Sequence, residues 1–117
     1  MRADDGKFEA FRKLHEEFFI LPACWDVFSA ALLQGAGCRA VATSSVSLGF
    51  ANGFPASRMI SKDRMLAEVS QIAASIDIPL SVDMESGYAD TPEGVEDNVR
   101  EIIRAGVVAF NIEDSLG

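Results

Sequence analysis

Four nearly continuous apolar runs are the feature that most constrains how this chain can fold. They occupy residues 18–22, 39–43, 79–83 and 107–112, and segments with helical periodicity lie between them. Continuously apolar strands are typical of parallel sheets whose faces are covered by helices, whereas strands with one face in water alternate apolar and polar residues. A leading helix followed by four strands that alternate with helices predicts parallel strands joined by right-handed crossovers.

Capping residues mark the ends of the expected helices. Ser61 is a candidate N-cap for the longest helix, and Thr91, with Pro92 at the first helical position, starts the next one. Gly106 is expected to end that helix. Another helix should cover 27–34 and stop at the glycines that follow it. A lead-in helix before the first strand is indicated by the apolar spacing of Phe8, Phe11, Leu14 and Phe18.

Two architectures fit this order of elements. A doubly wound open sheet has helices on both faces, and a (β/α)8 barrel needs eight strand–helix units and typically ~250 residues. The chain has 117 residues, so length alone favours a small open sheet in a single domain. In both architectures the carboxyl ends of the strands form the site, so polar residues at these ends are expected to converge.

The charge balance excludes several classes of partner. Eighteen acidic and ten basic residues give a formal net charge of −8, which repels nucleic acid and acidic membrane surfaces but suits cations and small ligands. No apolar run approaches the ~20 residues of a membrane helix, and the first residues lack the apolar centre of a signal peptide. We therefore expect a cytoplasmic protein without a nucleic-acid or membrane partner. Cys24 and Cys38 have no metal-binding spacing and are interpreted as small hydrophobes.

Acidic residues follow the third and fourth strand segments. Asp83 and Glu85 differ by two positions, so both side chains lie on one face if the strand extends that far, and a neighbouring strand brings Glu113 alongside. Three crowded carboxylates must take up protons or share a cation. Oxygen ligands without His or Cys suit Mg²⁺ or Mn²⁺. Asp83, Glu85 and Glu113 are therefore candidate metal ligands.

The same acidic residues have a simpler interpretation. Acidic residues after strands are often helix N-caps or solvated loop charges, and Asp90, just ahead of Thr91, is best interpreted in this way. A D-x-E spacing is also less specific than a Walker loop or an HExxH motif. The spacing alone leaves both interpretations open.

Neighbouring residues carry structural expectations of their own. Glycines and a proline predict an irregular loop over 46–60, and Tyr88 is expected to pack near the acidic cluster beside a tight turn at Gly87. Asp26 is expected to be a helix N-cap beside a packed Trp25, with a substrate-facing role as the alternative, and His15 to have a surface or packing role.

Four stretches taken together resemble one known superfamily. They are LPACWDVFSAALLQGAGCRAVATSS, TSSVSLGFANGFP, SVDMESGYAD and FNIEDSLG. They resemble the isocitrate lyase and phosphoenolpyruvate mutase superfamily from about Phe8 to Gly117, and within it the carboxyphosphonoenolpyruvate phosphonomutase or methylisocitrate lyase-like group. The resemblance implies a parallel (β/α)8 barrel, of which residues 1–117 are the N-terminal half, with Mg²⁺ at its mouth. It also implies oligomers.

The resemblance assigns roles to particular residues. Asp83, Glu85 and Glu113 match the acidic metal shell, and Ser44 and Ser45 match the loop that holds the substrate carboxylate. The implied reaction is cleavage or rearrangement of a C–C or P–C bond in a small α-oxo or α-hydroxy carboxylate. It proceeds through an enolate whose developing charge is neutralised by the metal. No catalytic side chain is assigned in this part of the chain.

Two departures from the family pattern matter. Ala56 stands in GFPAS where the family often has an acidic residue, and the four later strands with their gating loop do not occur in these 117 residues. A half-barrel exposes two strand edges and the inner face of its sheet, so we expect association with a second copy or with a complementary C-terminal half. The alternative is a truncated, noncatalytic α/β remnant or interaction module. A receiver-like phosphoacceptor domain is disfavoured because it would need an early acidic pair and a late Lys.

Overall fold

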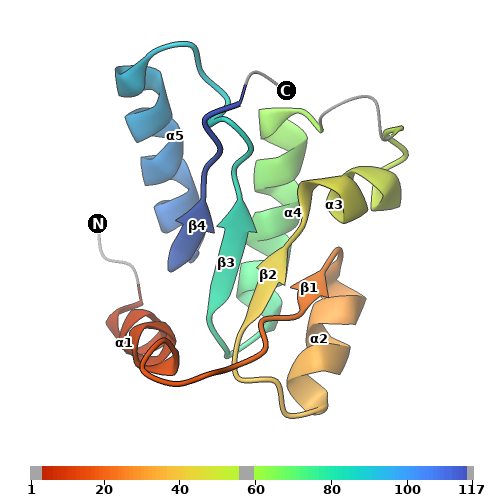
Figure 1. Ribbon diagram of the computed structural model, residues 1–117. Helices are drawn as coiled ribbons and strands as arrows, with labels where there is room; N and C mark the ends of the chain where they lie inside the picture. Colours follow the sequence, from red (N-terminus) through yellow and green to blue (C-terminus); the bar gives the residue numbers. More distant parts are fainter. Residues whose placement is uncertain (1–3, 56–59, 116–117) are drawn as a thin grey trace.

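The computed structural model describes residues 4–55 and 60–115, and helices alternate with strands along this part of the chain (Figure 1). A lead-in helix comes first, a second helix follows β2 before the longest helix, and every other crossover has one helix. The elements are α1 (Asp5–Leu14), β1 (Ala23–Cys24), α2 (Val27–Gly35), β2 (Val41–Thr43), α3 (Ser45–Ala51), α4 (Lys62–Ser75), β3 (Leu80–Asp83), α5 (Pro92–Arg104) and β4 (Ala109–Asn111).

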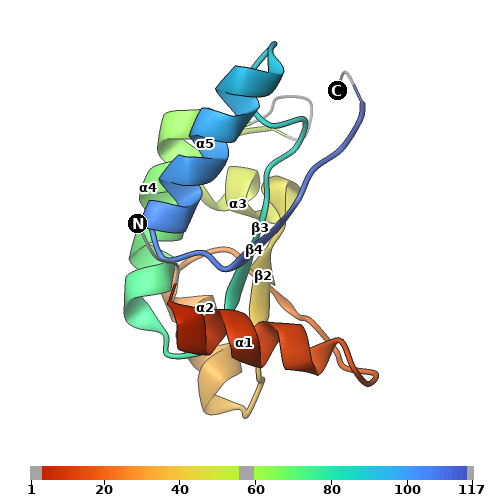
Figure 2. The ribbon, with the colours of Figure 1, turned by 90° about the vertical axis from the view of Figure 1, so that its left-hand side faces the viewer.

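The four strands form one parallel sheet in the order β1-β2-β3-β4. A doubly wound sheet reverses its strand order at a switch point, whereas a barrel adds each strand next to the preceding one. The helices α4 and α5 lie together on one side of the sheet, and the opposite side is left open by the described helices (Figure 2). The order and the one-sided covering identify a segment of a (β/α)8-type barrel and exclude the open doubly wound alternative.

The core fills the space between the sheet and its helices. Val41, Leu80 and Val82 are fully buried, together with Met65 and Ile72 of α4. Residues that alternate with these along the strands face the other side of the sheet. That second row consists of small side chains in register, Ala42, Ser81 and Ala109. Small residues there are consistent with a concave inner face.

Helix α1 covers the end of the sheet opposite the acidic strand ends (Figure 1). Phe11 and Leu14 are buried against Ala40, which immediately precedes β2. The Lys7 ammonium also donates to the carbonyl oxygen of Ile76, the C-cap residue of α4, at 2.9 Å. Apolar packing and one cap contact therefore dock the lead-in helix. No helix within residues 4–55 and 60–115 has the length and apolar character required to cross a bilayer.

The expected caps are confirmed. The Ser61 hydroxyl accepts from the Arg64 N–H at 3.3 Å, and the Thr91 hydroxyl accepts from the Gly94 N–H at 3.1 Å. Asp26 caps α2 in a reciprocal capping box with Ser29. Satisfied N–H groups at these first turns fix where each helix begins.

Two sequence-based expectations about the bounds of elements are wrong. The first strand was expected at 18–22 but lies at Ala23–Cys24, and Phe18 is 89% exposed outside α1. Residues 18–22 have no regular secondary structure and lead from α1 to the sheet. Their one backbone bond to β2 is made by the Pro22 carbonyl, which accepts from the Ala42 N–H. A loop was expected over 46–60, but its first part is the helix α3, in which Gly49 is buried. Residues 56–59, which include Ala56, lie outside the described residues.

Candidate metal centre

Asp83 ends β3 and is held by four polar contacts. Its backbone N–H donates to the Thr43 hydroxyl at 3.2 Å. Its Oδ2 accepts from the Ser45 N–H at 3.2 Å, and its Oδ1 accepts from the Glu85 N–H at 2.9 Å and from the Asn111 amide at 3.4 Å. A half-buried carboxylate surrounded by N–H donors keeps one orientation, which is a requirement for a metal ligand.

Glu85 reaches the site by a turn and not by extension of the strand. The strand ends at Asp83, and Glu85 has φ 51°, in the left-handed region. A shared strand face for residues 83 and 85 was expected if the strand extended to Glu85; it does not extend that far, so the two side chains do not share a strand face. The Glu85 carbonyl accepts from the Glu113 N–H at 2.7 Å, and this backbone bond brings the third acidic residue alongside.

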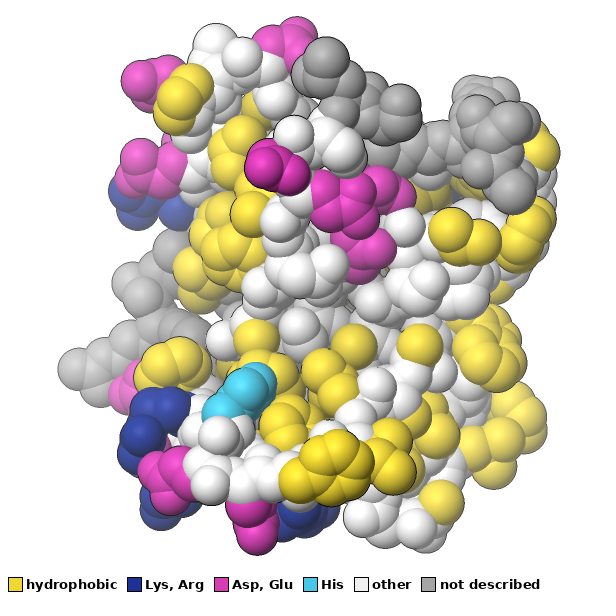
Figure 3. Space-filling view, in the orientation of Figure 1, with side chains coloured by type: hydrophobic (Ala, Val, Ile, Leu, Met, Phe, Trp, Pro, Cys, Tyr) yellow, Lys and Arg dark blue, Asp and Glu magenta, His cyan; other side chains and the backbone are white. Residues whose placement is uncertain are grey.

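The three predicted carboxylates meet at the carboxyl end of the sheet. One carboxylate oxygen from each of Asp83, Glu85 and Glu113 lies within 4.8 Å of the other two. Acidic side chains gather above the strand ends in the space-filling view (Figure 3). Asp83 and Glu85 are half-buried and Glu113 is exposed. Among residues 4–55 and 60–115 no Lys or Arg forms an ion pair with any of the three. The cluster thus has oxygen ligands and no described protein cation, a donor set that fits Mg²⁺ or Mn²⁺.

Ser44 and Ser45 lie at the start of α3, beside this cluster. Ser44 is the N-cap residue, and its side chain makes no capping bond. The Ser45 N–H is taken by Asp83, so the two hydroxyls, and not this N–H, are the groups left for a ligand. The structure brings both serines next to Asp83, as the order of the strands predicts.

Tyr88 closes the turn that follows Glu85. It has φ 58°, and its buried hydroxyl has no hydrogen-bond partner among the described residues. Burial, and after it the negative charges of Glu85 and Asp83, raise the pKa of Tyr88 to about 12. The expectation that Tyr88 packs near the acidic cluster is confirmed.

Three residues that contact the site were missed by sequence reasoning. Thr43 and Asn111 contact Asp83, and Asn98 of α5 donates to two carbonyls of the turn. Asn111 had a usable signal, because it stands in the strand that precedes Glu113 and pairs in register with Asp83. The only signal for Asn98 was that a polar residue stands within the apolar stripe of a helix, and this does not reveal which groups it contacts.

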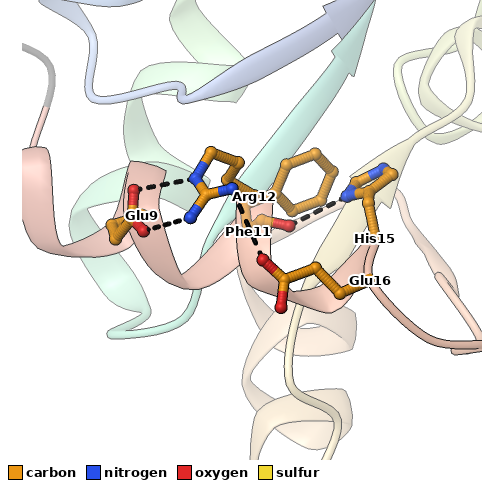
Figure 4. A network of polar contacts seen from close by, with 5 residues as sticks. All are labelled: Glu9, Phe11, Arg12, His15 and Glu16. Carbon is orange, nitrogen blue, oxygen red and sulfur yellow. Dashed lines mark hydrogen bonds and ion pairs between the residues drawn. The ribbon is translucent and has the colours of Figure 1, made fainter.

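The remaining candidates lie outside the site. Asp90 is exposed and is not the N-cap residue, which is Thr91. On α1, Arg12 bridges Glu9 and Glu16, and the His15 Nδ1 lies 2.9 Å from the Phe11 carbonyl oxygen (Figure 4). These contacts belong to α1 and its C-terminal end, which lie at the end of the sheet opposite the strand ends that carry the carboxylates.

The buried Cys24 is also not a candidate nucleophile. Burial raises the pKa of the Cys24 thiol to about 11, so the thiol stays protonated at neutral pH and is a poor nucleophile. This agrees with its interpretation as a small hydrophobe.

Parallel strands in sequential order, helices on the outer side and clustered carboxylates at the carboxyl ends define the chain as a segment of a (β/α)8-barrel protein. It belongs to the phosphoenolpyruvate phosphomutase family, whose sequence model matches residues 11–117. The resemblance to the isocitrate lyase and phosphoenolpyruvate mutase superfamily is thereby confirmed.

Individual relatives agree with this assignment. An uncharacterised protein of Mycobacterium tuberculosis is 33% identical over 108 residues, which are 91% of this chain and 40% of the relative. The 2-methylisocitrate lyase of Salmonella typhimurium is 30% identical over 75% of this chain and 30% of the enzyme. The chain thus spans at most about 40% of the length of these curated relatives.

Solved structures give the same picture. A candidate lyase or mutase of Burkholderia cenocepacia is 38% identical, with a TM-score of 0.89 over 96% of this chain and 40% of its own. A phosphonopyruvate hydrolase solved with oxalate and Mg²⁺ is 25% identical, with a TM-score of 0.86 over 93% of this chain and 39% of its own.

Proposed function

We propose that this chain supplies the metal-binding and carboxylate-binding part of a lyase or phosphonomutase-like enzyme. The enzyme depends on Mg²⁺ or Mn²⁺ and acts on a small α-oxo or α-hydroxy carboxylate through an enolate. The observation that carries the proposal is the convergence of three carboxylate oxygens within 4.8 Å. Membership of the phosphoenolpyruvate phosphomutase family and the Mg²⁺ and oxalate bound by the related hydrolase support it.

Asp83, Glu85 and Glu113 would hold the cation, directly or through water. A bound divalent cation supplies neutralisation of the negative charge that develops on a substrate oxygen. Asp83 is oriented for this role by the Ser45 and Glu85 N–H groups, and Glu113 is fixed by its backbone bond to Glu85. The hydroxyls of Ser44 and Ser45, adjacent to Asp83, would hold a substrate carboxylate next to the cation.

The rest of the site would come from a complementary part of the barrel. The described strands leave the outer edges of β1 and β4 unpaired and one sheet face open. The unpaired edges are where further strands can add. A C-terminal half of the barrel, or a second copy, would close the sheet and exclude water from the cation. The alternative is a noncatalytic remnant that keeps the fold alone, and such a remnant would bind no divalent cation at the cluster.

Thermal unfolding in the presence of Mn²⁺ or Mg²⁺ tests the proposal. A cation that binds only the folded state raises stability by mass action, about 2.7 kcal/mol at 100 times its Kd. We expect a rise in Tm with millimolar Mn²⁺ that is lost in Asp83→Asn and in Glu113→Gln. Asp90→Asn is the matched control, because it removes an exposed acidic charge outside the cluster. No Tm rise, or an equal rise in all three variants, overturns the proposal.

A further inference from the structure

The turn that carries Glu85 is built from strained backbone. Glu85 has φ 51° and Tyr88 has φ 58°, and Gly87 between them has φ 97°. Residues other than glycine adopt the left-handed region rarely, and such conformations persist only where the surroundings enforce them. The turn therefore needs support from outside its own residues.

Asn98 of α5 gives this support. It is only 8% exposed, and its Nδ2 donates to the carbonyl oxygens of Gly87 at 2.9 Å and of Tyr88 at 3.1 Å. Both amide hydrogens are thus used on consecutive carbonyls of one turn. A buried side chain in the middle of a helix has few alternative orientations, so the position of the turn follows that of α5.

Lys62, the first residue of α4, sets the orientation of the Asn98 amide. Its ammonium donates to the Asn98 Oδ1 at 3.2 Å and pairs with Glu101 at 3.1 Å. An ammonium only donates, so the amide oxygen must face Lys62 and the amide nitrogen must face the turn. Two helices therefore cooperate to present the amide hydrogens to the turn.

Close packing fixes the turn from the same side. A Cβ added at Gly87 would lie 2.7 Å from Val95 Cγ2 and 3.1 Å from Ile112 Cδ1. The backbone at Gly87 is therefore in contact with α5 and with the segment after β4. The turn cannot move closer to the helix, and the Asn98 amide keeps it from moving away.

We propose that Asn98 is a positioning residue for the carboxylate cluster. By holding Gly87 and Tyr88 it keeps Glu85 in its left-handed conformation facing Asp83 and Glu113, and so sets the affinity of the cluster for a divalent cation. This inference rests on the proposed function, because the cation is the ligand of that cluster. Groups that orient metal ligands from behind alter metal affinity by about 10–100-fold when they are lost.

Mn²⁺ binding to Asn98 variants tests this inference. Free Mn²⁺ is measured by electron paramagnetic resonance as Mn²⁺ is titrated into the unaltered chain, Asn98→Asp and Asn98→Leu. We expect the Kd to rise roughly tenfold or more in both variants. Glu101→Gln is the control, because it removes the other partner of Lys62 and leaves the Asn98 bonds to the turn in place; its Kd should not change. Two substitutions guard against one that fails to fold, and circular dichroism confirms folding.

A double-mutant cycle separates positioning from general destabilisation. If Asn98 acts through Glu85, Asn98→Asp should add no further loss of Mn²⁺ affinity in a Glu85→Gln background. A full further loss in that background overturns the proposal. In the metal-free protein, amide hydrogen exchange of residues 85–88 should be faster in Asn98→Asp and unchanged in Glu101→Gln.

The outcomes distinguish this inference from the function on which it rests. Absence of Mn²⁺ binding by the unaltered chain overturns the proposed function and this inference with it. Binding by the unaltered chain with an unchanged Kd in both Asn98 variants overturns this inference alone.

Discussion

The Glu113 N–H donates to the Glu85 carbonyl oxygen at 2.7 Å, beyond the last register pair of their strands, which is Asp83 with Asn111. Backbone pairing thus continues past the end of the sheet at the point where Glu85 turns into the left-handed region. The acidic side chains converge because their backbones are bonded together, although like charges in proximity repel. The crowded charges therefore reduce stability locally, and a cation bound as proposed would offset this loss.

Replacing Glu85 by glycine should stabilise the metal-free protein. Glycine adopts the left-handed region without penalty, and the substitution also removes one of three crowded charges. The two effects together should raise the free energy of unfolding by about 1 kcal/mol or more. Denaturant unfolding without metal measures the gain, and the same variant should lose the Mn²⁺-dependent rise in Tm. Glu85→Ala is the control, because it removes the charge and keeps the backbone penalty. An alanine variant as stable as the glycine variant would contradict the role of backbone strain.

Gly87→Ala should destabilise the protein by about 2–3 kcal/mol, because overpacking adds to an unfavourable backbone conformation. Gly87 has φ 97°, and a Cβ added there would lie 2.7 Å from Val95 Cγ2. Gly37→Ala isolates the backbone contribution, because Gly37 has φ 91° and nothing within 4 Å of an added Cβ; it should cost about 1 kcal/mol. Denaturant unfolding of both variants measures the difference, and equal losses would show that close packing at Gly87 is unimportant.

The elements predicted correctly from sequence are those whose signals are local. The Ser61 and Thr91 caps depend on side chains adjacent to their own helix termini, and the second to fourth strands lie inside their apolar runs. The convergence of the three acids was also predictable, because the carboxyl ends of neighbouring parallel strands meet at one edge.

The misplaced elements depend on contacts that no local pattern contains. Residues 18–22 are as apolar as a strand, but they approach the sheet from α1, and only the Pro22 carbonyl bonds to β2. Glycine disfavours helices, so Gly49 indicated a loop, yet it is buried within α3. The turn that begins at the left-handed Glu85 is bonded by residues outside it: Asn98 donates to the Gly87 carbonyl, and Glu113 donates to the Glu85 carbonyl. Tertiary contacts decided each of these positions.

Tyr88, the one tyrosine of the chain, should report the state of the site by its own titration. Ultraviolet absorbance of tyrosinate should give a pKa of about 12 in the folded protein and about 10 in denaturant. The unfolded state then releases the proton first, so the contribution of Tyr88 to stability is fully present below pH 10 and is lost as pH rises from about 10 to 12. With a discount for partial exposure the loss is about 1–2 kcal/mol.

Tyr88→Phe supplies the control for that titration. The variant should lack this loss of stability at high pH, and it should be more stable at neutral pH by about 1 kcal/mol, because a buried hydroxyl without a partner has been removed. A tyrosine pKa near 10 in the folded protein would contradict the burial of the hydroxyl.

Ser45→Ala should separate carboxylate binding from metal binding. Asp83 accepts the Ser45 backbone N–H, which alanine retains, so the Mn²⁺-dependent rise in Tm should not change. The lost hydroxyl is a candidate donor to a small dicarboxylate, and one hydrogen bond to a charged group is worth about 1.5 kcal/mol, or roughly tenfold in affinity. Oxalate titrated calorimetrically into the Mn²⁺-saturated protein measures this difference. Ser47→Ala is the matched control, because the Ser47 hydroxyl is engaged within α3 by the Ser44 carbonyl at 3.2 Å. Equal oxalate affinities in the two serine variants would remove Ser45 from the carboxylate site and leave the three acidic residues as a cation site without an adjoining substrate contact from α3.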